Sequence, residues 1–321
     1  MECMKPKAVY ITRSNLSASW ITPHANVYLK PLQVVTVYDT VLCVPRASRV
    51  PHEIDTRCSR IIRYDHMWDI PHLLVGEMNE QTSLFTGFDF PCLFLARQLK
   101  RCFGCQWTLF LWDPPSLSHR DVSCLVRHCI DFVWRHIARC ADKLVLNIHP
   151  GLLEEIGYKP PIGQKVEFRM QDAFDSIQPA AIDEYVEFEY DFGVLSNWTN
   201  AKGGDLVASM LRQMPGKTCL WIGSPPLKPV KAPITFVGRM AQKEAFARLQ
   251  KCRVLLVPYL PVPSLKWNYP LKLFEYLKLG RPIVASDNPG NAAVAARFPD
   301  RIKLFESGNV ESLCEVLRHL E

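Results

Sequence analysis

The second half of the chain alternates strand-like and helix-like runs almost to its last residue. Short apolar, β-branched runs recur at residues 188–195, 218–222, 234–237, 253–258, 282–285 and 302–305. Helical patterns follow most of them, at residues 204–214, 243–252, 270–279, 292–298 and 310–320. This alternation is typical of parallel βαβ units. It predicts a doubly wound α/β domain.

The first half of the chain has a similar but less regular pattern. Strand-like runs recur at residues 8–12, 40–45, 73–75, 108–112 and 143–148, with helical patterns at 92–102 and 121–142. A chain of 321 residues usually forms two domains of this size. The stretch 171–191 holds seven acidic residues and no basic one, which indicates a junction. We therefore predict an N-terminal domain over 1–168, a junction over 169–190 and a C-terminal domain over 191–321.

The helix predicted over 121–142 has two different faces. Apolar side chains share one face, which we expect in the core: Val122, Leu125, Cys129, Phe132, Val133, Ile137 and Cys140. Basic side chains share the other face: Arg120, Arg127, His128, Arg135 and Arg139. The basic face is either an ordinary solvated surface or a stripe that lies on anionic lipid. Trp20, Trp68 and Trp107, in the same half, fit the second interpretation.

Composition restricts the partners and the compartment. The net charge of +6 is mild, which argues against nucleic acid as a partner and is compatible with anionic small molecules or an anionic membrane face. The first residues contain no secretory signal pattern, and no apolar run is long enough to span a bilayer. Several of the twelve cysteines lie in apolar runs. We expect reduced thiols and a cytoplasmic location.

The familiar cofactor and metal motifs are missing from the sequence. Cys102 and Cys105 form a lone Cys-x-x-Cys without the second ligand pair that zinc sites of this type need. We therefore expect no metal and no cofactor. The sequence contains no G-x-G-x-x-G, Walker A or G-x-S-x-G pattern, which counts against dehydrogenases, P-loop NTPases and α/β-hydrolases.

The most informative segment is YPLKLFEYLKLGRPIVAS, residues 269–286. Pro270 suits a first helical turn and Gly280 suits a left-handed C-terminal cap, so a short helix and a buried strand are predicted. Lys272 and Glu275 lie on the same helical face. Near a helix start, such a pair suits a diphosphate and a ribose diol. Alternatively, it is an ordinary surface ion pair at i, i+3.

This segment resembles the donor-binding segment of nucleotide-sugar glycosyltransferases with the GT-B architecture. The similarity is greatest to the large retaining family that includes many bacterial polysaccharide and lipid-glycan transferases. Further motifs of that family follow in the same order: FGVL at 192–195 with KGGDL at 202–206, LWIG at 220–223, TFVGR at 235–239 and LLVP at 255–258. The resemblance implies two Rossmann-like domains that face a central cleft.

The resemblance also assigns donor-side roles. Lys202 would contact the donor phosphates and Glu275 the ribose hydroxyls. The backbone of Pro270, Leu271 and Lys272 would meet the diphosphate, with the Lys272 side chain as further support. Arg239 and Met240 would border the base. The co-substrate would be a nucleoside-diphosphate sugar.

Two positions depart from the family pattern. Val194 stands where the family usually has an arginine, and Trp267 stands where it usually has an acidic residue that positions the sugar. These departures favour a compact, divergent member. They also keep open a non-catalytic protein that binds a sugar nucleotide or a glycan.

The acceptor side rests on two residues of the first domain. Asp113 follows the strand-like run 108–112 and His149 follows the run 143–148, so each is a candidate for orienting or deprotonating an acceptor hydroxyl. Each also has a purely structural interpretation: Asp113 caps a turn before two prolines, and His149 is held by hydrogen bonds.

The function that the resemblance implies is sugar transfer to a glycan or lipid-linked acceptor. The resemblance favours retention of the anomeric configuration and transfer without a metal. It also implies a role in polysaccharide biosynthesis at the inner membrane face. An inverting enzyme with Asp113 as base remains an alternative, as does a nucleotide-sugar epimerase.

Overall fold

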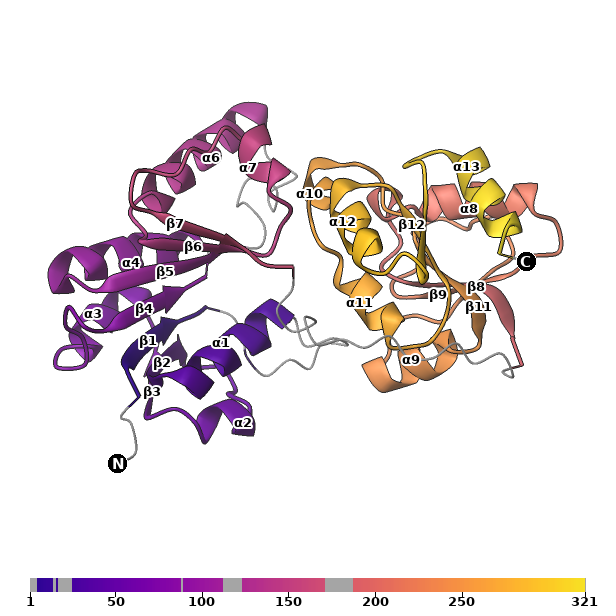
Figure 1. Ribbon diagram of the computed structural model, residues 1–321. Helices are drawn as coiled ribbons and strands as arrows, with labels where there is room; N and C mark the ends of the chain where they lie inside the picture. Colours follow the sequence, from indigo (N-terminus) through magenta and orange to yellow (C-terminus); the bar gives the residue numbers. More distant parts are fainter. Residues whose placement is uncertain are drawn as a thin grey trace. The chain divides into compact units, whose positions relative to one another are not determined.

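The computed structural model describes residues 5–13, 16, 25–87, 89–111, 123–170 and 187–320. The chain divides into two compact units, 1–169 and 170–321. Each unit holds one parallel sheet with helices packed against it (Figure 1). The α/β fold class predicted from the alternation is confirmed.

The sheet of the N-terminal unit has seven strands in the order β3-β2-β1-β4-β5-β6-β7. Their bounds are β1 Lys7–Ile11, β2 Asp39–Pro45, β3 Arg60–Tyr64, β4 Ser83–Thr86, β5 Gln106–Leu111, β6 Lys143–Leu146 and β7 Lys165–Phe168. All the pairings are parallel. The central strands are continuous apolar runs, which suits strands that are covered on both faces.

The helices of this unit are α1 Ala25–Val37, α2 His52–Asp55, α3 Ile70–Leu73, α4 Phe90–Phe103, α6 Cys124–Ala138 and α7 Gly151–Glu155, with a short 3₁₀ turn η1 Met67–Asp69. The sequence signals of α4 are observed: Asp89 Oδ1 accepts the Cys92 N–H and Gly104 ends the helix at φ 65°. The strand predicted at 73–75 is wrong. Leu73 ends α3, and the next strand, β4, begins at Ser83.

The expected core face of α6 is only partly correct. Leu125 and Phe132 are 74% and 69% exposed, and Cys129 is exposed as well. Of the expected face Ile137 is buried, and Trp134 and Ala138, which lay outside it, are buried beside it. Trp134 stacks on Tyr158, with ring centroids 5.7 Å apart and the planes 6° from parallel. The chain after β6 thus supplies the partner that decides which face of α6 is buried.

The sheet of the C-terminal unit has six strands in the order β10-β9-β8-β11-β12-β13. Their bounds are β8 Tyr190–Leu195, β9 Cys219–Ile222, β10 Ile234–Phe236, β11 Cys252–Val257, β12 Ile283–Ser286 and β13 Ile302–Phe305. They lie within one or two residues of the predicted runs. The helices are α8 Gly204–Gln213, α9 Gln242–Leu249, α10 Pro263–Lys266, α11 Leu271–Leu277, α12 Pro289–Arg297 and α13 Val310–Arg318, with a 3₁₀ turn η3 Asn200–Lys202.

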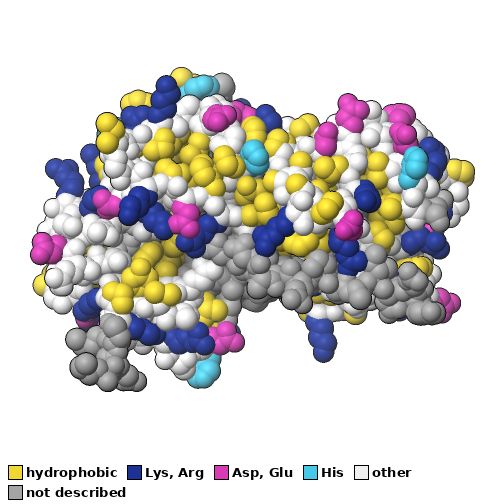
Figure 2. Space-filling model, in the orientation of Figure 1, with side chains coloured by type: hydrophobic (Ala, Val, Ile, Leu, Met, Phe, Trp, Pro, Cys, Tyr) yellow, Lys and Arg dark blue, Asp and Glu magenta, His cyan; other side chains and the backbone are white. Residues whose placement is uncertain are grey.

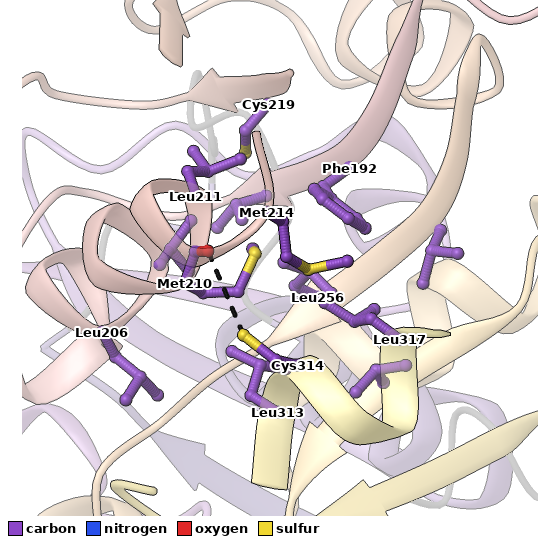
Figure 3. Packing of buried hydrophobic residues seen from close by; sticks show 14 of the residues in the cluster. Phe192, Leu206, Met210, Leu211, Met214, Cys219, Leu256, Leu313, Cys314 and Leu317 are labelled. Carbon is purple, nitrogen blue, oxygen red and sulfur yellow. Dashed lines mark hydrogen bonds between the residues drawn. The ribbon is translucent and has the colours of Figure 1, made fainter. Parts of the chain in front are cut away.

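One face of this sheet is covered by α8 and α13, which pack side by side on it (Figure 3). Leu206, Met210 and Leu211 of α8 meet Leu313 and Leu317 of α13 over Phe192 and Leu256 of the sheet. The Cys314 thiol lies 4.0 Å from the Met210 carbonyl oxygen between the two helices. Burial raises the pKa of Cys314, so the thiol behaves as a small apolar side chain.

Candidate functional site

The C-terminal sheet has a topological switch point between its two central strands. From β8 the chain proceeds outward through β9 and β10, and from β11 it proceeds the other way through β12 and β13. In open α/β sheets, ligands bind beyond the carboxyl ends of the strands at such a point. The candidate donor residues Lys202, Pro270, Leu271, Lys272 and Glu275 all come from the connections that follow β8 and β11.

The connections after β8 and β11 are in direct contact. The Leu260 N–H donates to the Ala201 carbonyl oxygen at 3.0 Å. Gly203 has φ 78°, and a Cβ there would lie 2.0 Å from the Pro258 carbonyl oxygen. Only glycine satisfies both conditions without moving the backbone. The glycine after Lys202 thus fixes this loop against the end of β11.

Lys202 lies at this contact. Its backbone N–H donates to the Thr199 hydroxyl at 3.2 Å. Its ammonium lies 4.5 Å from the centroid of the Tyr259 ring and 3.5 Å from the Tyr259 hydroxyl. The Tyr259 carbonyl oxygen accepts from Asn288 Nδ2 at 2.9 Å. The ring holds the half-buried ammonium in place, and the ammonium has further N–H groups that can donate hydrogen bonds. Lys202 is therefore suited to bind an anionic ligand.

Helix α11 carries the second cation and the carboxylate. It begins at Leu271, one residue after Pro270, and Gly280 follows it at φ 65°. Lys272 Nζ lies 2.8 Å from Glu275 Oε2. The ion pair therefore exists, but Glu275 is only 3% exposed, so it is not an ordinary surface pair. A buried carboxylate needs partners for both oxygens.

The second partner of Glu275 is a residue that the sequence did not indicate. Gln242 Nε2 donates to Glu275 Oε1 at 3.2 Å, from the first residue of α9. No motif marks Gln242, because the two residues are 33 positions apart and meet only in the folded unit. Tyr259 was missed as well, although an aromatic residue just after the strand-like run 253–258 was a usable signal.

Tyr276 ties α11 to the end of β8. Its hydroxyl accepts the Leu195 N–H at 2.7 Å. Burial raises the pKa of Tyr276 well above its usual value, so the phenol stays neutral. This hydrogen bond fixes the helix that carries Lys272 and Glu275 relative to the loop that carries Lys202.

The loop predicted to border the base is held by β9. The Gly223 N–H donates to the Gly238 carbonyl oxygen at 2.8 Å, and Arg239 Nε donates to the Ser224 hydroxyl at 3.1 Å. Arg239 is exposed and Met240 half-buried, so both can meet a ligand. Their role beside a base stays a prediction.

The two departures from the family pattern lie in different surroundings. Val194 is 1% exposed, in the core beneath α8 and α13. Trp267 is half-buried at the end of α10, and the Lys266 ammonium lies 4.5 Å from a Trp267 ring centroid. Gly290 of α12 packs against the same segment, where a Cβ would lie 1.9 Å from the Asn268 carbonyl oxygen.

The candidate acceptor residues belong to the N-terminal unit. Asp113 lies outside the described residues, so its placement stays a prediction. His149 follows β6 and is half-buried, and its Nδ1 accepts the Gly151 N–H at 3.2 Å. Desolvation lowers the pKa of His149, so the imidazole is neutral at pH 7 with its proton on Nε2. This hydrogen bond matches the structural interpretation of His149 and leaves a catalytic role untested.

The described residues show neither a cluster of metal-ligating side chains nor a membrane-spanning helix. No group of three or more His, Cys, Asp or Glu side chains there is arranged to hold a metal ion. None of the helices described is long and apolar enough to cross a bilayer.

Comparison with known proteins identifies the fold of the chain and the family of its C-terminal unit. Residues 191–320 match the family model "Glycosyl transferases group 1". No curated protein matches the sequence. Among solved structures, the chain is similar to the apo form of the lipopolysaccharide outer core galactosyltransferase WaaB, with TM-score 0.60 and 14% identity over 98% of this chain and 90% of that one.

Two trehalose 6-phosphate enzymes are similarly related in structure. The E. coli protein bound with UDP-2-fluoro glucose gives TM-score 0.63 at 10% identity, over 98% of this chain and 91% of that one. The synthase from Burkholderia multivorans gives TM-score 0.62 at 11% identity, over 99% and 89%. At such identities the structures establish the fold, and the family model identifies the C-terminal unit. Residues 191–320 therefore form a group 1 glycosyl transferase domain, and the chain has the two-domain fold of GT-B glycosyltransferases.

Proposed function

We propose that this chain moves a sugar from a nucleoside-diphosphate sugar to a glycan or lipid-linked acceptor. The observation that carries the proposal is the buried Glu275 carboxylate, held by Lys272 in the connection after β11, together with Lys202 in the connection after β8. A carboxylate suits the ribose hydroxyls and two ammonium groups suit the diphosphate. The donor thus occupies the switch point of the group 1 domain.

The charge that develops in the reaction is the negative charge of the departing diphosphate. Lys202 and Lys272 stabilise it electrostatically, so we propose that transfer needs neither a metal nor a cofactor. Retention of configuration is proposed on the family likeness. Inversion, with Asp113 as general base, is the alternative, and the anomeric configuration of the product distinguishes the two.

The acceptor is proposed to bind the N-terminal unit near Asp113 and His149. Because the neutral His149 imidazole carries its proton on Nε2, it is able to orient an acceptor hydroxyl by donating to the hydroxyl oxygen. Replacing His149 with Asn keeps a polar side chain without an imidazole. We expect lower turnover with unchanged donor binding. Unchanged turnover would leave His149 with only its structural role.

The donor site is tested by calorimetry with UDP, GDP, dTDP and ADP. We expect one nucleotide to bind the wild-type protein, and Lys272→Ala and Glu275→Ala to weaken that binding about tenfold or more while the unit stays folded. Lys278→Ala, at the exposed end of the same helix, is the matched control and should bind normally. A folded wild-type protein that binds none of the four nucleotides would contradict the proposal.

A non-catalytic protein that binds a sugar nucleotide or a glycan is the second candidate. Trp267 favours it, because a tryptophan replaces the acidic side chain expected to position the sugar. An assay for release of nucleoside diphosphate from a bound donor, run with and without acceptors, distinguishes the two candidates. Nucleotide binding without release from any matching donor sugar would favour the second.

We further propose that the protein works in the cytoplasm on the inner membrane face, in polysaccharide biosynthesis. The support comes from the outer surface of α4 and α6. Leu125, Cys129 and Phe132 form an exposed stripe along α6, and Phe94 of α4 is 44% exposed. On the side of the N-terminal unit that carries α6, apolar and basic side chains lie next to one another (Figures 1 and 2).

The charges around this stripe suit anionic lipid. Helix α4 contains three basic residues and no acidic one. The one acidic residue of α6, Asp131, accepts a hydrogen bond from Trp134 Nε1 at 2.9 Å. Arg127 and Arg139 are exposed, whereas Arg135 donates to the Ile156 carbonyl oxygen at 2.6 Å and has a structural role. An apolar stripe beside basic side chains is the pattern of helices that lie in a membrane interface.

Co-sedimentation with vesicles tests this surface. We expect the wild-type protein to bind anionic vesicles, and Leu125→Ser with Phe132→Ser to weaken binding severalfold. Ile162→Ser is the matched control, because Ile162 is fully exposed elsewhere in the same unit. Equal binding by the double variant and the wild-type protein would remove α6 as the contact.

A further inference from the structure

Gln242 lies where two parts of the donor site meet. It is the first residue of α9, two positions after Met240, and its side chain reaches Glu275 on α11. The bond runs from the connection after β10, which is the edge strand, to the helix that follows the central strand β11. Gln242 is half-buried, so one side of its amide remains accessible.

The chemistry of the pair fixes the orientation of the amide. An ionised carboxylate only accepts hydrogen bonds, so the group that Gln242 turns toward Glu275 must be its NH₂. The 3.2 Å distance is indeed between Gln242 Nε2 and Glu275 Oε1. The carbonyl oxygen of Gln242 is then directed away from Glu275. It can accept one more hydrogen bond.

Glu275 is constrained in the same way. Lys272 Nζ holds Oε2 at 2.8 Å, and Gln242 Nε2 holds Oε1. Each carboxylate oxygen has a second lone pair, so each can accept from a hydroxyl without losing its present partner. Because the carboxylate is held at both oxygens, its lone pairs point in fixed directions.

We propose that Gln242 is a second ribose-binding residue, which together with Glu275 makes the site select ribonucleoside diphosphate donors over 2′-deoxyribonucleoside ones. This inference rests on the proposed donor site. A ribose diol supplies two O–H donors, one for the Glu275 carboxylate and one for the Gln242 carbonyl oxygen. A deoxyribose supplies one fewer and leaves a polar atom of the site desolvated and unpaired, which sites of this kind penalise strongly.

A preference ratio tests the proposal. Calorimetry of the whole chain measures the ratio of the dissociation constants of deoxyribonucleotides to those of ribonucleotides. The ligands are UDP, GDP and ADP, their 2′-deoxy counterparts, and dTDP. We expect a ratio of about ten or more for the wild-type protein. Gln242→Ala should weaken ribonucleotide binding about three- to tenfold and leave deoxynucleotide binding almost unchanged, so the ratio falls toward one.

Two further variants sharpen the test. Gln250→Ala removes the same side chain from the exposed far end of α9 and should leave both affinities and the ratio unchanged. Gln242→Glu keeps the length but places a second carboxylate against Glu275, so ribonucleotide binding should fall at pH 8 and recover as the pair takes up a proton at lower pH. Thermal unfolding verifies that each variant is folded.

Each other outcome is decisive. Equal weakening of ribo and deoxy binding in Gln242→Ala would mean that Gln242 only supports the fold, and this would overturn the inference alone. Tightest binding of dTDP would also overturn it while leaving the donor site in place. A folded wild-type protein that binds no nucleotide would overturn the proposed donor site, and the inference with it.

Discussion

At the scale of single residues, the proposed donor site depends on close contacts that allow little substitution. Gly203 and Gly290 each leave no space for a Cβ, because backbone oxygens of the neighbouring connections lie about where it would be. Glu275 has both oxygens engaged while almost fully buried. Gly203 and Glu275 position Lys202 and Lys272 before any ligand arrives, as the proposed electrostatic stabilisation of a leaving group requires.

Replacing Gly203 with alanine tests the contact between the connections after β8 and β11. The new Cβ would overlap the Pro258 carbonyl oxygen, so we expect a loss of about 1–3 kcal/mol in the free energy of unfolding and weaker nucleotide binding. Gly216→Ala is the control, because Gly216 also has positive φ (85°) but has nothing within 4 Å. Equal losses in both variants, measured by denaturant unfolding, would show that backbone strain and not the contact is responsible.

The protonation of His149 gives a second residue-scale prediction. Because burial disfavours the imidazolium, the imidazole should titrate below its usual 6.5, which NMR of the ring protons measures. The unfolded chain then binds more protons than the folded one below pH 6.5. The free energy of unfolding should therefore fall as the pH drops from 6.5 through the folded-state pKa, and His149→Asn should reduce that fall. Titration above 6.5 would contradict the assignment.

At the scale of elements, α8 and α13 show how a terminal helix is fixed to the sheet. Leu313 is fully buried between α13, α8 and the strands beneath them. Leu313→Ala should lower the free energy of unfolding of this unit by about 2–5 kcal/mol through the cavity it leaves. Glu315→Ala, on the exposed side of α13, should change it by less than about 0.5 kcal/mol. A small effect of Leu313→Ala would mean that α13 packs loosely.

Helix α6 shows the limit of helical periodicity as a guide to burial. The repeat of Leu125, Cys129 and Phe132 correctly predicted a helix, but it did not reveal which face the sheet would cover. Trp134 and Ala138, which the predicted face did not include, are buried together with Ile137. The stacking of Trp134 on Tyr158 comes from the chain after β6, so no local pattern contains it.

At the scale of the whole molecule, the proposed donor residues belong to one unit and the candidate acceptor residues to the other. Hydrogen exchange with and without the nucleotide found by calorimetry tests this division. We expect the strongest protection at residues 199–203, 258–260 and 271–276, with little change in β1 to β5. Protection centred on the N-terminal unit would move the donor site there and contradict the proposal.

Patterns in the sequence predicted the class of fold and the segment that carries the proposed donor site. Strand and helix periods are local properties, so the C-terminal strands were predicted almost residue by residue, and the 269–286 motif located Lys272 and Glu275. Tertiary structure decided the rest. The burial of Glu275, the meeting of Lys202 with Tyr259, the bond from Gln242 and the buried face of α6 all join residues from separate elements. Such contacts depend on how the strands order themselves in the sheet, which no local period encodes.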